Sequence, residues 1–230
     1  MKYFAIVVIF FIGIFASQSQ TYEIGGIVGG ANYIGDVGPT NYISPNDLAI
    51  GGILRWNRSD RHSFRFTAMF AGLKSDDLDS EEQRRKERGL SFKNRVIELA
   101  AGIEYTFWEF DVHSSKTQFA PYLYTGLTYF NYESLYLDRN NQLKKYGNDW
   151  AFAIPMVVGY KTTAIRHVVL GFEIGARYTF TDNLDGSNPT GDKEDQPSLK
   201  FGNINSNDWY VFTGINITFS FGRQPCYCNF

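Results

Sequence analysis

Six charged residues could form a buried network, because each occupies an alternate position in a strand-like segment. They are Arg55, Arg65, Glu98, Glu104, Glu173 and Arg177. Successive side chains of a β-strand point to opposite faces, so these residues share one face while apolar residues occupy the other. If that face is enclosed, the charges must pair, because an unpaired buried ion is costly. The set could form an ion path or gate, or it could fill the interior with salt bridges. We favour the second interpretation.

The spacing of two of these charges indicates which strands carry their ion-pair partners. Glu173 and Arg177 face the same side of one segment, but they lie roughly 13 Å apart at the rise of a strand. We therefore expect their partners on neighbouring strands.

Two cysteines close to the C-terminus, Cys226 and Cys228, are a second candidate for chemistry. A disulfide between them would be strained, since only one residue separates them. They could instead form a disulfide to a partner, bind a metal or remain free thiols. We give a disulfide to a partner the same weight as the other possibilities combined.

The three histidines, His62, His113 and His167, are the candidates for catalysis or metal binding. A Ser/His/acid site needs its members within hydrogen-bond reach of each other. The sequence contains no P-loop, nucleophile elbow or zinc-protease motif. We therefore expect no catalytic residue, no metal and no cofactor.

Eight segments of alternating residues must position these side chains. In 168–180, for example, every second residue is apolar, and the intervening residues are mostly small, polar or charged. Each segment is about long enough to cross a bilayer as a tilted strand. The pattern predicts an all-β fold, an eight-stranded antiparallel transmembrane β-barrel. The expected strands are Tyr22–Ile34, Leu48–Trp56, Ser63–Leu73, Val96–Trp108, Phe119–Phe130, Trp150–Tyr160, Val168–Phe180 and Trp209–Phe221.

The gaps between these strands are alternately long and short, which gives the barrel an orientation. Outer-membrane barrels have short periplasmic turns and longer extracellular loops. We therefore expect both termini, the three histidines and the two cysteines on the periplasmic side. Lipid A lies in the opposite leaflet, which counts against a lipid A enzyme. The long gaps are Gly35–Asp47, Lys74–Arg95, Asn131–Asp149 and Thr181–Asp208, and the short gaps are Asn57–His62, Glu109–Gln118 and Lys161–His167.

The ends of the chain indicate export. Residues 1–20 contain an early Lys, an apolar run of about 13 residues and then small and polar residues, which is typical of a secretory signal peptide. We expect the barrel in residues 21–222 and a periplasmic, cysteine-containing tail in residues 223–230. The net charge of −2 argues against nucleic acid as a partner. The charged gap 74–95 could be a docking loop, but we favour a solvated loop with a helical turn.

Several short motifs, in this order and spacing, resemble the PorG family, small outer-membrane barrels of the type IX secretion system in Bacteroidota. The resemblance covers nearly the whole chain after residue 20. It implies a structural role beside a periplasmic ring built from a PorK-like lipoprotein and its PorN-like partner, in protein export and gliding motility. On this basis Cys226 and Cys228 would face the ring. The motifs are Tyr22–Gly26, Asn32–Asp36, Arg88–Phe92 leading into Ile97 and Glu98, Phe119–Tyr122, and Gly171–Arg177 before Thr181–Asp185.

Two other functions compete with this anchoring role. One is an outer-membrane enzyme that modifies lipid, and the other is a soluble lipid-binding barrel of lipocalin type, whose strands also alternate. A soluble barrel would expose one strand face to water, yet neither face carries many Lys or Asp. The sequence therefore favours the outer membrane, with membrane lipid and the periplasmic ring as partners.

Overall fold

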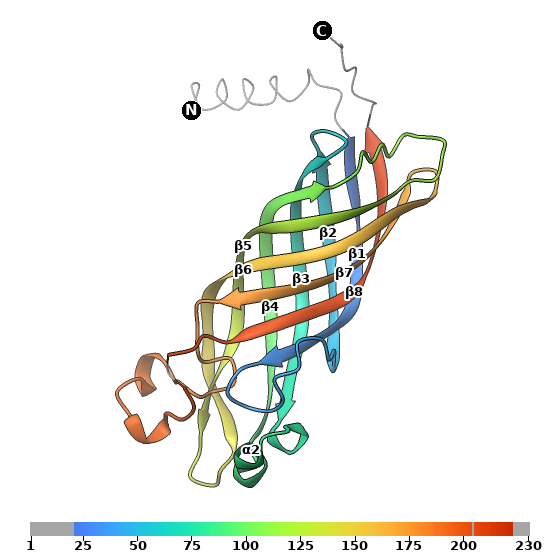
Figure 1. The fold of residues 1–230 in the computed structure, drawn as a ribbon. Helices are drawn as coiled ribbons and strands as arrows, with labels where there is room; N and C mark the ends of the chain where they lie inside the picture. The colour runs from blue at the N-terminus through green and yellow to red at the C-terminus, as the bar shows by residue number, and fades with distance from the viewer. Residues whose placement is uncertain (1–20, 204, 223–230) are drawn as a thin grey trace, which may run out of the picture.

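The computed structural model describes residues 21–203 and 205–222, which form one closed β-barrel (Figure 1). Each strand pairs antiparallel with the next, and the last strand closes on the first. The predicted fold class, an eight-stranded antiparallel barrel, is therefore confirmed. The expected signal peptide and cysteine tail lie outside the described residues. The strands are β1 (Thr21–Ile34), β2 (Asp47–Asn57), β3 (His62–Asp76), β4 (Ser91–Thr106), β5 (Phe119–Leu137), β6 (Leu143–Ile165), β7 (Val168–Thr179) and β8 (Trp209–Gly222).

Alternation along each strand separates the two faces of the barrel wall. In β4, for example, Glu98 and Glu104 are buried in the lumen, whereas Leu99 and Ile103 are more than half exposed on the outside. Gly102 and Gly126 face each other in the register of β4 and β5, and a Cβ on either would lie within 2.2 Å of the opposite backbone. These two glycines allow the close backbone approach that strand curvature requires.

The expected bounds of the fifth and sixth strands differ most from the structure. β5 and β6 continue far beyond the predicted ends and form one long hairpin with a bulge between Ser134 and Leu135. The expected long loop 131–149 is therefore mostly strand. The sequence did not indicate this because the hairpin extension is rich in polar and charged residues, and its apolar residues, such as Tyr132 and Leu135, do not alternate regularly.

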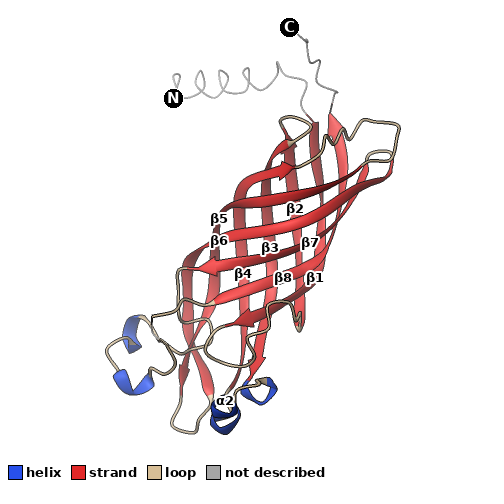
Figure 2. Cartoon of the chain, viewed as in Figure 1, coloured by secondary structure: helices blue, strands red, loops and turns tan. Residues whose placement is uncertain are grey.

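Within the described residues, short helices occur only in the loops at the end of the barrel opposite Thr21 and Gly222 (Figure 2). The charged gap 74–95 contains a 3-10 turn, η1 (Asp77–Asp79), and a helix, α2 (Gln83–Arg88). The loop between β7 and β8 contains η2 (Gly191–Lys193) and η3 (Pro197–Leu199). In the described part of the chain, no helix is long and apolar enough to span a membrane.

Thr21 and Gly222, which pair with each other, mark one end of the barrel. We call this end the turn end, because the connections β2–β3, β4–β5 and β6–β7 are also found there (Figure 1). We call the opposite end the loop end.

Candidate functional site

The lumen near the turn end is filled by a network of ion pairs. Arg55 donates from Nε to Glu104 at 2.8 Å and from Nη1 to Glu23 at 3.1 Å. Lys161 donates to the second oxygen of Glu104 at 2.8 Å. All four side chains are at most 2% exposed. Glu23 also accepts bonds from Asn57 and Thr218, so neither of its oxygens lacks a donor.

A second group of ion pairs continues the network toward the middle of the barrel. Arg65 binds both oxygens of Glu173, at 2.7 and 2.9 Å, and the hydroxyl of Tyr122 donates to Glu173 at 2.6 Å. Arg177 donates to Glu98 at 3.0 Å, and Tyr210 donates to the same carboxylate at 2.5 Å. Bidentate geometry and tyrosine donors hold these carboxylates in fixed positions.

The network joins every strand of the barrel. Four carboxylates face four basic groups, so the enclosed charges balance. Each strand contributes at least one member, and closure of the barrel brings all of them within hydrogen-bond distance. In order from β1 to β8 these are Glu23, Arg55, Arg65, Glu104, Tyr122, Lys161, Glu173 and Asn216.

All six charges selected from the sequence point into the lumen. The expectation that Glu173 and Arg177 pair with neighbouring strands is wrong. Glu173 on β7 pairs with Arg65 on β3, and Arg177 on β7 pairs with Glu98 on β4. An eight-stranded barrel is just wide enough for its side chains to fill, so long side chains reach across it.

Sequence reasoning missed Glu23 and Lys161, which complete the charge balance. Glu23 could have been found, because it alternates with Tyr22 and Ile24 at the start of β1. Lys161 was assigned to a turn, since the expected strand ended at Tyr160, whereas β6 continues to Ile165.

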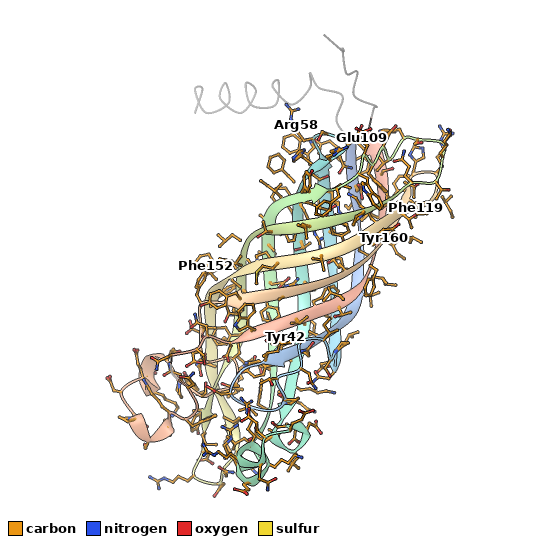
Figure 3. The ribbon with its side chains drawn as sticks, viewed as in Figure 1. Tyr42, Arg58, Glu109, Phe119, Phe152 and Tyr160 are labelled. Carbon is orange, nitrogen blue, oxygen red and sulfur yellow. The ribbon has the colours of Figure 1, made fainter. Side chains whose placement is uncertain are left out.

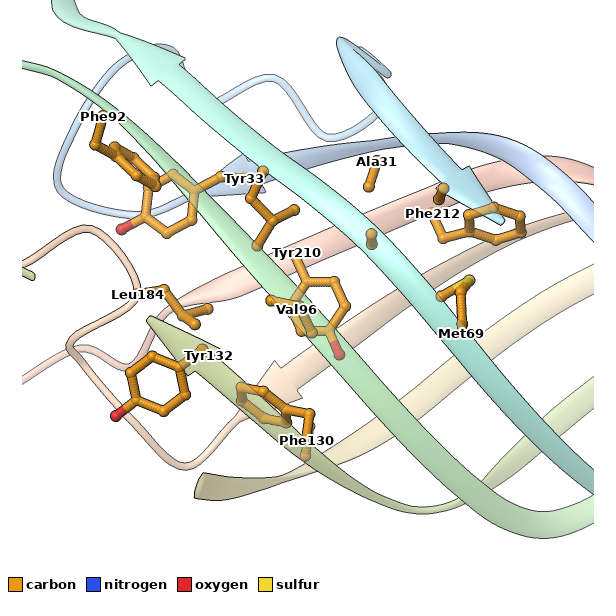
Figure 4. Packing of buried hydrophobic residues seen from close by; sticks show 14 of the residues in the cluster. Ala31, Tyr33, Met69, Phe92, Val96, Phe130, Tyr132, Leu184, Tyr210 and Phe212 are labelled. Atoms are coloured by element: carbon orange, nitrogen blue, oxygen red, sulfur yellow. The ribbon is translucent and has the colours of Figure 1, made fainter. Parts of the chain in front are cut away.

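Apolar and aromatic side chains form a cluster in the lumen toward the loop end. Tyr33 packs edge-on against Phe92 with ring centroids 4.9 Å apart, and Phe130 packs against Tyr210 at 5.8 Å (Figure 4). Leu184, from the loop between β7 and β8, is fully buried in the same cluster. Salt bridges and aromatic packing together fill the lumen, so the arrangement favours a closed barrel over a diffusion channel.

Large apolar side chains cover the outside of the barrel. Phe119, Phe152 and Tyr160 point away from the wall (Figure 3). Their exposed fractions, 53%, 46% and 46%, are those of surface residues, although their types are usually buried. Other members of this outer surface include Ile24, Ile50, Phe66, Leu99, Leu127, Ile154, Phe172 and Ile217.

Aromatic rings gather at both ends of this outer surface. Near the turn end, stacked or tilted ring contacts link Phe221, Tyr22, Trp56 and Phe64 in a row across four adjacent strands. Near the loop end, one group contains Tyr129, Trp150 and Phe152, and a second contains Tyr178, Phe180 and Trp209. We call these two sets the aromatic girdles.

The histidines lie at the turn end. His113 lies against His167, with ring centroids 6.3 Å apart, and its Nε2 is 2.9 Å from the hydroxyl of Thr21. His62 instead packs on Tyr105. Across residues 21–203 and 205–222, no group of three or more His, Cys, Asp or Glu side chains could hold a metal ion as it stands. Cys226 and Cys228 lie outside the described residues.

The charged loop that contains α2 is held to the loop after β1 by Asp77. This fully buried carboxylate accepts bonds from Arg88 at 2.7 Å and from the backbone amides of Gly38 and Leu90 at 2.8 and 3.0 Å. Burial alone would raise the pKa of Asp77, but these hydrogen bonds outweigh it and lower the pKa. Part of the charged loop is therefore docked and not simply solvated.

Asp77→Asn should release this loop. Losing a charge-assisted contact to Arg88 costs about 1–3 kcal/mol, enough to raise trypsin cleavage within residues 84–88 by about fivefold or more. A lowered folded pKa stabilises at neutral pH, and this stabilisation is lost as the pH falls through that value. Wild type should therefore open in acid, whereas the variant is already open. Equal cleavage of both proteins at neutral pH would contradict the role of Asp77.

A second acidic group lies in the loops at the loop end. Asp208 accepts a short hydrogen bond from the hydroxyl of Tyr33 and another from the backbone amide of Leu184 at 2.8 Å. Burial, followed by the charges of Asp36 and Asp185, raises the pKa of Asp182 to about 7. Burial also raises the pKa of Asp185, and burial with the charge of Asp185 raises that of Asp208.

A family model matches residues 2–230, which is nearly the entire chain. The chain belongs to the family described as a domain of unknown function, DUF6089. No curated protein matches it. The family description assigns no chemistry, so any function must be argued from the barrel itself.

Several solved structures are similar in fold. Neisserial surface protein A has a TM-score of 0.45 and 9% identity, over 88% of this chain and 97% of that one. The outer membrane protein OprG from Pseudomonas aeruginosa has a TM-score of 0.44 and 9% identity, over 89% of this chain and 97% of that one. A major outer membrane protein from Thermus thermophilus has a TM-score of 0.46 and 14% identity, over 89% of this chain and 100% of that one. At these scores and identities the similarity carries no functional argument.

Proposed function

We propose that this protein is a non-enzymatic barrel of the bacterial outer membrane. In this proposal it anchors or stabilises a periplasmic ring of the type IX protein secretion and gliding machinery. The observation that carries the membrane part is the apolar outer surface bounded by two aromatic girdles. Transmembrane barrels carry an apolar band of this kind, with aromatic rings at both membrane interfaces.

The spacing of the girdles agrees with the thickness of a bilayer. Trp209 and Phe221 lie at the two ends of β8, twelve residues apart. At about 3.3 Å per residue and a tilt of about 45°, they are separated by roughly 28 Å along the barrel axis. The apolar band of outer-membrane barrels is about 25 Å tall. A soluble lipid-binding barrel would have no use for two girdles at this separation.

The filled lumen supports a structural role. An ion would have to break balanced salt bridges and then cross an apolar, aromatic layer, which together oppose both water and charge. We therefore expect planar bilayers containing the purified barrel to show no stable open state. A stable open state of pore-like conductance in wild-type protein would contradict the structural role and favour a channel.

The difference between the two ends supports an orientation. The shortest connections, β2–β3 and β6–β7, lie at the turn end, and the longest, β3–β4 and β7–β8, lie at the loop end. Periplasmic turns are short and extracellular loops are longer, so the turn end would face the periplasm, although β4–β5 is longer than β5–β6. Cys226 and Cys228 follow Gly222, the last residue of β8, which lies at that end. The tail is thus within reach of a ring beneath the membrane. The choice of a PorK-like lipoprotein and a PorN-like partner rests on the sequence resemblance alone.

Replacing both cysteines by serine tests the contact with the ring. Non-reducing gels of wild-type membranes should show a higher-mass adduct that is lost in Cys226→Ser/Cys228→Ser and in reduced samples. Crosslinking in intact cells before purification should recover ring components with the wild type. If both proteins migrate equally, the proposed disulfide to a partner does not form. Crosslinking that recovers no ring component would overturn the anchoring role.

A deletion strain separates this function from the other two. Loss of type IX secretion with unchanged lipid A is the expected result. Altered lipid A that depends on His62, His113 or His167 would favour a lipid-modifying enzyme. Recovery of the protein in the soluble periplasm would favour a lipid carrier.

A further inference from the structure

Four carboxylates at the loop end form no salt bridge with any basic residue in the described part of the chain. They are Asp36, Asp182, Asp185 and Asp208, and the last three are at most 9% exposed. Arg88, which interacts electrostatically with Asp36 and Asp185, is committed to Asp77 at 2.7 Å.

The lumen of the same barrel provides the contrast. There each of four buried carboxylates has a Lys or Arg within 3.1 Å. A buried charge must be paired, bind a metal or lose its charge, because an isolated ion is far more stable in water. In the described part of the chain, no basic side chain forms a salt bridge with the loop cluster. Two solutions remain for these carboxylates: loss of the charge by protonation, or a bound cation.

Unsatisfied atoms in the segment Asp182–Asp185 show where a ligand would bind. Both carboxylate oxygens of Asp182, Oδ2 of Asp185 and both amide atoms of Asn183 are buried without a hydrogen-bond partner. Asn183 and Asp185 are fully buried. Water could satisfy the amide, but water does not neutralise carboxylates.

We propose that the segment Asp182–Asp185 binds a divalent cation of the calcium class. Its free donors are oxygens, which calcium and magnesium prefer over softer metals. Calcium takes six to eight oxygen ligands in flexible geometry, and it accepts amide, carbonyl and water oxygens beside carboxylates. Such a mixed set is needed here, because acidic side chains alone do not form a finished site in the described residues.

The rest of the cluster adds negative potential and fixes the segment in place. Asp208 holds the backbone of Leu184, and Asn94 donates to the carbonyl of Leu184 at 2.6 Å. Asp36 is held by the backbone amide of Asn203. A bound cation would therefore brace the loop between β7 and β8 against the loop after β1, over the loop end of the lumen.

Calcium titration of the purified full barrel in detergent tests the site. After treatment with EDTA, thermal unfolding is followed by circular dichroism in CaCl2, MgCl2 and NaCl of matched ionic strength. We expect calcium to raise the midpoint by about 5 °C or more with saturation, which NaCl does not reproduce. Equilibrium dialysis should find close to one calcium per chain. If the wild-type protein binds no calcium, the proposal is overturned, and this result does not depend on any variant.

Asp182→Asn locates the site, since it removes the charge of Asp182 and keeps the size of the side chain. The variant should be more stable than wild type in EDTA, because it removes a repulsive charge, and it should lose the calcium response. Asp185→Asn is the second variant in case the first does not fold. Asp138→Asn is the matched control, because Asp138 pairs with Lys144 on another loop at 2.6 Å. A full calcium response in Asp182→Asn, or stabilisation by low pH but not by calcium, would overturn the proposal.

Discussion

Arg55→Met is expected to destabilise the barrel by about 3–5 kcal/mol, the cost of breaking a buried ion pair from one side. The guanidinium forms the only salt bridge of Glu23 among the described residues, at 3.1 Å, and it also binds Glu104. Glu104 keeps its salt bridge with Lys161, but Glu23 would be fully buried without a salt bridge, and its hydrogen bonds would come from Asn57 and Thr218. The measurement is urea unfolding of the barrel in lipid vesicles.

Two controls separate the lost pairing from lost packing. Arg61→Met removes a basic residue from an ion pair with Glu109, and these side chains are 44% and 76% exposed. An exposed pair of this kind contributes about 0–1 kcal/mol. Adding Glu23→Gln to Arg55→Met removes the stranded charge and should recover part of the loss. If Arg55→Met and Arg61→Met unfold at the same urea concentration, the lumen network does not stabilise the barrel.

Leu127→Arg should destabilise the barrel by about 1–3 kcal/mol in lipid vesicles, because an arginine inside the apolar band must leave water, at a cost that falls from about 2–4 kcal/mol at the midplane toward the interface. Leu127 is 52% exposed in the middle of β5 and points outward. In a barrel surrounded by water, the same substitution would be nearly neutral, since surface changes are usually within about 0.5 kcal/mol. The predicted loss therefore depends on the lipid environment.

Phe119→Arg is the matched control on the same strand. Phe119 is equally exposed, at 53%, but it is the first residue of β5, beside the membrane interface in our proposal. Arginine there should cost about 0–1 kcal/mol, because its charged end reaches water. Equal costs for Leu127→Arg and Phe119→Arg would argue against a bilayer around the middle of the barrel.

Much of the architecture could be predicted because barrel strands have a local signal. The period of two indicates which residues face inward, so Arg55, Glu98 and the other selected charges were assigned to one face without knowledge of any contact. The long hairpin of β5 and β6 gave no such signal. Its polar residues are ordered by cross-strand pairing beyond the apolar band, and pairing is not encoded in the alternation of one segment.

The sequence by itself determined the number of strands, their antiparallel order and the inward side of the strands that carry the six selected charges, because these depend on residues that are close in the chain. It left the inward side of the fifth strand open, since aromatic residues occupy both of its faces. Only the tertiary structure decided which charges pair, since Arg65 and Glu173 are 108 residues apart and meet across the lumen. Closure of the barrel also decided that the lumen has a charged layer and an apolar layer. The same closure gathered four aspartates at the loop end without a salt bridge to a basic residue in the described chain, because loops far apart in sequence converge where the strands end.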